Sequence, residues 1–181
     1  MSRNRYVGDY RLVESIDQRG RIRTDYEYIS ADYVFAAGGE AARGVLTRAL
    51  VACGMGWLAF VGALTPLSAA TRAWWVALPF AFVALPLALM TGAVARALRA
   101  KEPLEHRYAD QLENRCPACS FFTMLLSAVA LIGEGVNWAR GAELLTGDIV
   151  FAACAALLFG VSWHNHRLWK RVKCEASRTP S

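Results

Sequence analysis

Charge is scarce in most of this chain, and the motifs of common enzymes are missing. Only 19% of the 181 residues are charged, whereas 55% are hydrophobic. The sequence contains no glycine-rich phosphate loop, no Ser/His/Asp set and no glutamate-flanked zinc-protease motif, so nothing supports a hydrolase. It also lacks a basic and aromatic nucleic-acid-binding module. We therefore expect no nucleic-acid partner, although the net charge is +5.

The hydrophobic residues are concentrated in four stretches, each about twenty residues long, which is the length a helix needs to cross a lipid bilayer. The predicted spans are residues 45–65, 73–95, 118–138 and 146–166. Short loops join the first two spans and the last two, so the predicted fold is an all-α four-transmembrane-helix bundle of two antiparallel hairpins. Residues 44–167 would form this membrane domain, between a cytoplasmic N-terminal segment, 1–43, and a basic cytoplasmic tail, 168–181. The first apolar run follows a long polar segment, so we expect no secretory signal peptide.

The positive charges predict the orientation, because Lys and Arg are retained on the cytoplasmic side during insertion. Eighteen of the twenty Lys and Arg residues lie in the N-terminal segment and first turn of span one, in the loop 96–117 or after the end of span four. The other two short loops hold only Arg72 and Arg140. We therefore expect a multi-pass protein of the cell inner membrane, with both termini in the cytoplasm.

Before the first span, residues 10–29 predict a β-hairpin. Two runs of β-favouring residues flank a turn from Asp17 to Gly20. An isolated hairpin is only marginally stable, so it would lean on the membrane, on the middle loop or on another protein whose sheet it extends.

The middle loop predicts a further helix opened by Pro103. Its apolar stripe consists of Leu104, Tyr108, Leu112 and Cys116. We expect an amphipathic cytoplasmic helix lying on the bilayer between spans two and three, with continuation of span two as the alternative.

A CxxC motif, Cys116 to Cys119, lies at the predicted cytoplasmic start of span three. Pro117 suits the first turn of a helix, where partial positive charge favours the thiolate. The inner end of span four would bring His164 and His166 to the same membrane face, and thiolates with imidazole are the ligands of tetrahedral zinc. The alternative is that no cofactor binds and these residues only pack.

Four spans with one CxxC motif resemble the quinone-coupled disulfide-forming enzymes of the bacterial inner membrane. Those enzymes act on the extracytoplasmic side and relay electrons through a second cysteine pair. Here the single pair, Cys116 and Cys119, is expected inside, and the predicted outer loops contain no cysteine. The resemblance therefore does not extend to the activity.

An acidic cluster is predicted at the outer face. Glu134 and Asn137 lie three residues apart near the end of span three, and Asp148 opens span four. Ionisable groups at the hydrocarbon edge are costly unless they are wet or paired. These residues would form an ion or proton site, or Glu134 would pair with Arg140 or Arg72.

Three functions follow from these features. The first is a non-catalytic accessory or scaffold subunit that sits in the lipid bilayer and binds a protein partner through its cytoplasmic face. The second is a small transporter or channel subunit, working as a homo-oligomer because four spans leave little room for an internal pathway. The third is a thiol metal-binding or redox protein that uses Cys116 and Cys119.

Overall fold

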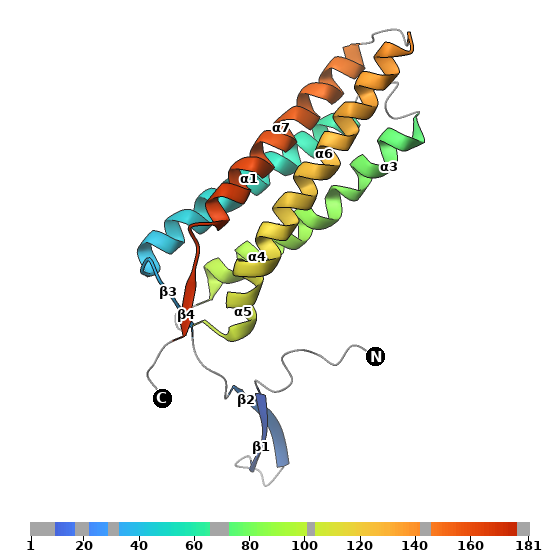
Figure 1. The fold of residues 1–181 in the computed structure, drawn as a ribbon. Helices are drawn as coiled ribbons and strands as arrows, with labels where there is room; N and C mark the ends of the chain where they lie inside the picture. The colour runs from blue at the N-terminus through green and yellow to red at the C-terminus, as the bar shows by residue number, and fades with distance from the viewer. Residues whose placement is uncertain are drawn as a thin grey trace.

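The computed structural model describes residues 10–16, 22–28, 33–65, 73–100, 104–141 and 146–176. Long helices pack side by side into one elongated bundle (Figure 1). They are α1 (Gly39–Leu64), α3 (Trp74–Phe82) with α4 (Ala84–Arg99), α6 (Cys116–Ala139) and α7 (Thr146–Trp169). We call basal the end of the bundle at which α4 ends and α6 begins, and distal the end at which α1 and α6 end.

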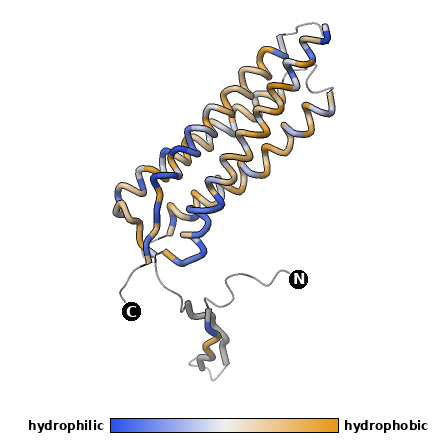
Figure 2. The backbone as a smooth tube through the Cα atoms, viewed as in Figure 1, coloured by the Kyte–Doolittle hydropathy of each residue, from blue (hydrophilic) through white to orange (hydrophobic). Residues whose placement is uncertain are grey.

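The helices are long and apolar enough to cross a bilayer four times. A stretch such as α1, with 26 residues, is about 39 Å long and exceeds the hydrocarbon core of about 30 Å. Large apolar side chains point outward, including Leu58, which is 76% exposed, and Ile132, which is 68% exposed. Figure 2 shows hydrophobic residues along the helices and hydrophilic residues gathered toward the ends, most of all the basal end. The chain is therefore a four-span integral membrane protein, as the sequence predicts.

Each span contacts two neighbouring spans, with α3 and α4 together forming the second span. Helix α1 packs against α7 and α4, and α6 packs against α7, α3 and α4. Small residues allow close approach: a Cβ built on Gly56 of α1 would lie 3.2 Å from Leu87 and 3.7 Å from Leu158. Without a hydrophobic force between helices in lipid, such close packing holds the bundle together.

The second span is broken in the middle. Helix α3 ends at Phe82 and α4 begins at Ala84, with Val83 between them donating to the carbonyl of Phe80 at 3.0 Å. Pro86 cannot donate to the carbonyl four residues earlier, and its ring crowds that carbonyl, so the helix bends here.

The third span begins earlier than the sequence suggests. Helix α5 (His106–Asp110) runs through the π-helical turn η2 (Gln111–Arg115) directly into α6. The separate amphipathic helix on the bilayer, and its alternative as a continuation of span two, are therefore wrong. The apolar stripe packs on the protein instead, with Leu112 and Cys116 buried. Pro117 explains the wider turn, because it lacks the donor for residue 113 and its ring needs the extra space.

Four short strands accompany the bundle. Strands β1 (Tyr10–Ile16) and β2 (Ile22–Tyr28) pair antiparallel as the predicted hairpin, whose turn lies outside the described residues. Strand β3 (Tyr33–Phe35) pairs with β4 (Cys174–Ala176), joining chain segments on either side of the membrane domain. The sheet of β3 and β4 lies beside the basal end, where Tyr33 bonds to Leu104, and the sheet of β1 and β2 lies beyond that end (Figure 1).

Candidate functional site

A polar seam runs along the buried face of α6. Its members lie three, four or seven residues apart, so they lie on one side of the helix. The buried polar residues of this seam are Ser120, Thr123, Ser127, Glu134 and Asn137. All three hydroxyls donate to the carbonyl four residues earlier, Ser120 at 3.0 Å, Thr123 at 2.9 Å and Ser127 at 2.8 Å. These groups are therefore satisfied within the helix and need no ligand.

Glu134 differs from the rest of the seam. Its side chain is only 1% exposed, and its Oε2 accepts a 3.4 Å hydrogen bond from Nδ2 of Asn137. Its Oε1 is buried without a hydrogen-bond partner. Asp148, in the first turn of α7, is fully buried and lies near the Glu134 carboxyl group. The three residues of the predicted acidic cluster thus meet at the distal end of the bundle.

The alternative of an ion pair with Arg140 does not occur. The Arg140 guanidinium lies 5.9 Å from the centre of the Trp75 ring, a cation–π contact between α6 and α3. Among the described residues, no salt bridge joins it to Glu134. The other predicted partner, Arg72, lies outside the described residues.

The CxxC motif lies inside a continuous helix rather than at a helix start. Because α5 and η2 precede Cys116, the partial positive charge expected at an N-terminus is not available to its thiol. Cys116 is fully buried and Cys119 is half-buried. The enclosed Cys116 thiol packs as a small apolar side chain does.

His164 and His166 of α7 lie in different surroundings. Nδ1 of His166 lies 3.3 Å from the Pro117 carbonyl oxygen, so this ring reaches the CxxC segment. His164 is exposed in a groove beside Thr47 and Arg48 of α1. In the part of the chain that the structure describes, no three Cys, His, Asp or Glu side chains lie close enough to hold a metal ion. The zinc site stays a prediction.

The core of the bundle also holds polar contacts that the sequence patterns do not predict. The Trp169 indole donates to Ser120 at 3.1 Å, and the Trp57 indole donates to Thr91 at 3.2 Å. Asn165 is fully buried, with its Oδ1 unpartnered. The helical spacing of α7 could have predicted this burial. Asn165 and Trp169 lie on the same face of the helix as Leu158 and Ser162, which are buried.

No protein-family model, curated protein or solved structure matches this chain.

Proposed function

We propose that this protein is a non-catalytic membrane subunit that binds a protein partner at its basal end, and that this end is cytoplasmic. The observation that carries the proposal is the two-stranded sheet of β1 and β2, which projects from the basal end of the bundle (Figure 1). Each strand pairs only with the other within the described residues, so both outer edges are open. An open edge is a template for a strand from another protein.

The exposed side chains of β1 agree with a docking role. Leu12 is 59% exposed and Val13 is 36% exposed, and they point to opposite faces of the strand. A two-stranded sheet with apolar groups on both faces is marginally stable by itself. A partner strand would complete the sheet, cover these side chains and stabilise the hairpin.

The packed interior favours a subunit over a channel. Phe60, Phe80 and Phe151 form an aromatic cluster inside the bundle, with Phe80 centred 5.3 Å from Phe60 and 4.9 Å from Phe151. All three are buried. These rings occupy the space in which a pathway through one bundle would have to run.

The orientation rests on the charges. Arg96, Arg99, Arg167, Lys170 and Arg171 all lie at or near the basal end, and Lys and Arg are retained on the cytoplasmic side. The partner is therefore a cytoplasmic protein, or a membrane protein with a cytoplasmic strand to donate.

The test is site-specific photo-crosslinking from the hairpin. A photoreactive amino acid at Leu12 or Val13 of the full-length chain should give one defined crosslinked partner in native membranes, because these side chains would be covered by it. The same group at Lys170, which is exposed at the basal end but remote in sequence from the hairpin, is the matched control. Deletion of residues 1–31 should abolish co-purification of that partner.

The deletion stops at residue 31 because β3 belongs to the bundle. Phe35 is 8% exposed and its strand pairs with β4, so a longer deletion would unfold the basal end as well as remove the hairpin. A full-length preparation that stays alone at every stage in mild detergent, or a partner retained by the shortened chain, would contradict the proposal.

A second candidate function rests on Glu134. A buried carboxyl oxygen without a partner, beside a second carboxyl group, is a place where a proton or a small cation would bind. Flux of protons or sodium ions in proteoliposomes should then be lost in Glu134→Gln and Asp148→Asn but kept in Glu40→Gln, which removes an exposed carboxylate from α1. Equal flux in Glu134→Gln and wild type excludes the site.

A further inference from the structure

A lateral groove of about 540 Å³ opens between α4 and α6 in the basal half of the bundle. Its walls are apolar and face outward, with Leu85 61% exposed, Leu89 57% exposed and Phe122 54% exposed. Among the described residues, no other helix of the chain packs over these side chains. In a membrane, the groove would be filled from the lipid side.

The length of the groove fits one leaflet. Leu85 and Arg96 lie eleven residues apart along α4, which corresponds to about 16 Å of helix. Half of the hydrocarbon core is about 15 Å thick. An acyl chain lying in the groove from Leu85 would therefore place its headgroup close to Arg96.

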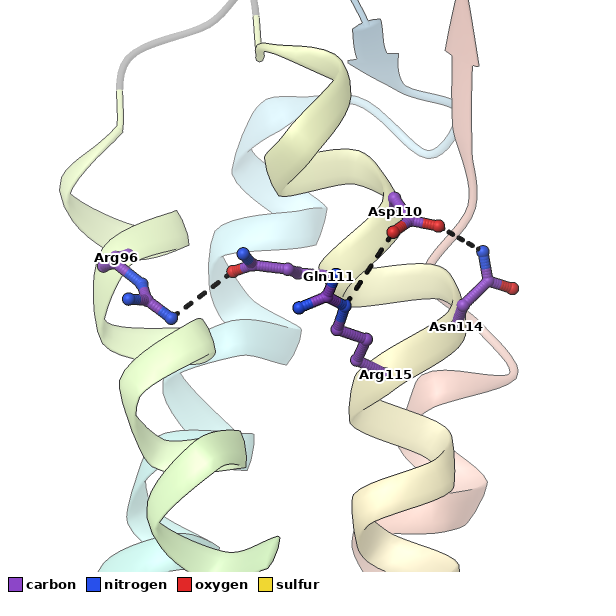
Figure 3. Close-up of polar contacts among 5 residues, drawn as sticks. All are labelled: Arg96, Asp110, Gln111, Asn114 and Arg115. Atoms are coloured by element: carbon purple, nitrogen blue, oxygen red, sulfur yellow. Dashed lines mark hydrogen bonds and ion pairs between the residues drawn. The ribbon is translucent and has the colours of Figure 1, made fainter. Parts of the chain in front are cut away.

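The basal mouth of the groove is cationic. Arg96 and Arg115 both line it. Figure 3 shows their side chains extending toward Gln111, Arg96 from α4 and Arg115 from η2. An Arg96 nitrogen donates to Oε1 of Gln111 at 3.5 Å, and Gln111 is only 6% exposed, so a buried amide orients this guanidinium. Arginine presents five donors in a fixed plane, so one bond to Gln111 leaves most of the fork for an anion.

The second arginine is held by a buried carboxylate. The Arg115 Nε lies 3.9 Å from Oδ2 of Asp110, whose other oxygen accepts a 2.8 Å bond from Asn114 (Figure 3). The Arg115 side chain is 57% exposed, and that of Asp110 is 6% exposed. Among the described residues that line the groove, Arg96 and Arg115 are the charged ones, and their charge is positive.

We propose that this groove is a binding site for one anionic glycerophospholipid of the basal leaflet. An acyl chain lies along Leu85, Leu89 and Phe122, and the phosphate binds Arg96 and Arg115. A protein helix would match the apolar walls but not the cationic mouth at the depth of a headgroup. Basic pockets between membrane helices bind anionic headgroups for this reason.

The experiment is native mass spectrometry of the full-length protein in detergent with added phosphatidylglycerol or phosphatidylcholine. Wild type should retain one phosphatidylglycerol about tenfold more tightly than phosphatidylcholine, which corresponds to about 1.4 kcal/mol, because the two arginines attract a headgroup with a net negative charge. Arg96→Gln/Arg115→Gln should lose this preference. Ala118→Trp, which fills the groove from an exposed position, should weaken both lipids.

Two controls separate this site from general attraction to charge. Arg99→Gln removes an exposed charge in the last turn of α4, and Arg48→Gln removes the cation of the groove between α1 and α7. Both should bind like wild type, and thermal unfolding should show every variant folded. Soluble glycerophosphate should not compete, because the acyl chain supplies most of the contact.

Three results would overturn the proposal. They are equal retention of the two lipids by wild type, an unchanged preference in Arg96→Gln/Arg115→Gln, and a preference that follows Arg48 or Arg99 instead. Competition by soluble glycerophosphate would assign the arginines to a free anion rather than to a lipid.

Discussion

At Gly133 the backbone of α6 comes so close to α3 that a Cβ atom would lie 2.7 Å from Cγ2 of Val76. Val76 is fully buried and β-branched, so it cannot rotate away without strain. We predict that Gly133→Ala destabilises the bundle by about 1–3 kcal/mol, the usual cost of overpacking a core. Unfolding in mixed micelles measures the difference.

Gly135 provides the matched control. It lies on the same helix, and a Cβ there would meet nothing within 4 Å. Gly135→Ala should leave stability unchanged or raise it slightly, because alanine is the better helix former. If both variants unfold alike, the close contact between α3 and α6 is not as described.

Cys174 in β4 gives a prediction about pH. Burial, and then the charge of Glu113, raise the pKa of this thiol from 9.0 to about 11. Glu113 lies close because its Oε1 accepts a 2.6 Å bond from the Cys174 amide. The thiolate, and not the thiol, is the form that reacts with alkylating reagents. In a variant lacking the other cysteines, the alkylation rate of Cys174 should therefore rise with a midpoint near pH 11 rather than near pH 9.

Glu113→Gln tests the electrostatic part of that shift. The amide keeps an acceptor for the Cys174 backbone but removes the negative charge, so the midpoint of the rate profile should move to lower pH. The sign follows because a nearby anion disfavours a thiolate. A midpoint that does not move would mean that burial alone protects the thiol.

The residue patterns predicted part of the candidate site. Glu134, Asn137 and Asp148 could be grouped from sequence because an acid inside an apolar run is conspicuous and the two spans form a hairpin. The partner of Arg140 was harder to predict from the sequence, because its position suits a contact with either Glu134 or the Trp75 ring. Only the packing of α3 against α6 decides between them.

Among the elements, β3 connects the N-terminal residues to the bundle through backbone hydrogen bonds. Tyr33 exchanges backbone hydrogen bonds with Leu104 at 2.9 and 2.8 Å and stacks on His106, with ring centres 5.4 Å apart. Phe35 is buried at the far end of the strand. We predict that deleting residues 1–31 leaves the melting temperature of the bundle nearly unchanged, whereas deleting residues 1–37 lowers it by several degrees.

The longer deletion removes buried apolar area, the pairing of β3 with β4 and the hydrogen bonds between Tyr33 and Leu104. The shorter deletion removes only the hairpin and the residues beside it, so it should cost the bundle little stability. Scanning fluorimetry of the two purified chains, with wild type alongside, makes the comparison. Equal melting temperatures for the two deletions would show that β3 does not support the basal end.

The sequence predicts long elements better than short ones. The spans follow from charge-free runs of membrane length, and the break in span two follows from Pro79 and Pro86, which remove backbone donors. Strands β3 and β4 have three residues each. In the sequence, the whole membrane domain separates them, so no local pattern predicts that they pair. The extension of span three was missed because an apolar stripe looks alike whether lipid or protein covers it.

On the scale of the whole molecule, the bundle has two unlike ends. The basal end carries both sheets and most of the positive charge, and the proposed lipid groove opens toward it. The distal end carries the buried carboxyl groups and the exposed Trp74 and Trp75. This asymmetry is why we place the partner at one end and the candidate cation site at the other.

The central claim is that the helices carry these two ends to opposite sides of the membrane, with the basal end inside. Accessibility of single introduced cysteines tests it most directly, in a variant lacking the native ones. Ala139→Cys and Lys170→Cys are both at exposed positions, at the distal and basal ends respectively. A membrane-impermeant thiol reagent should label Ala139→Cys in intact cells and Lys170→Cys only after the membrane is opened. Labelling of both positions in intact cells, or the reverse order, would contradict the claim.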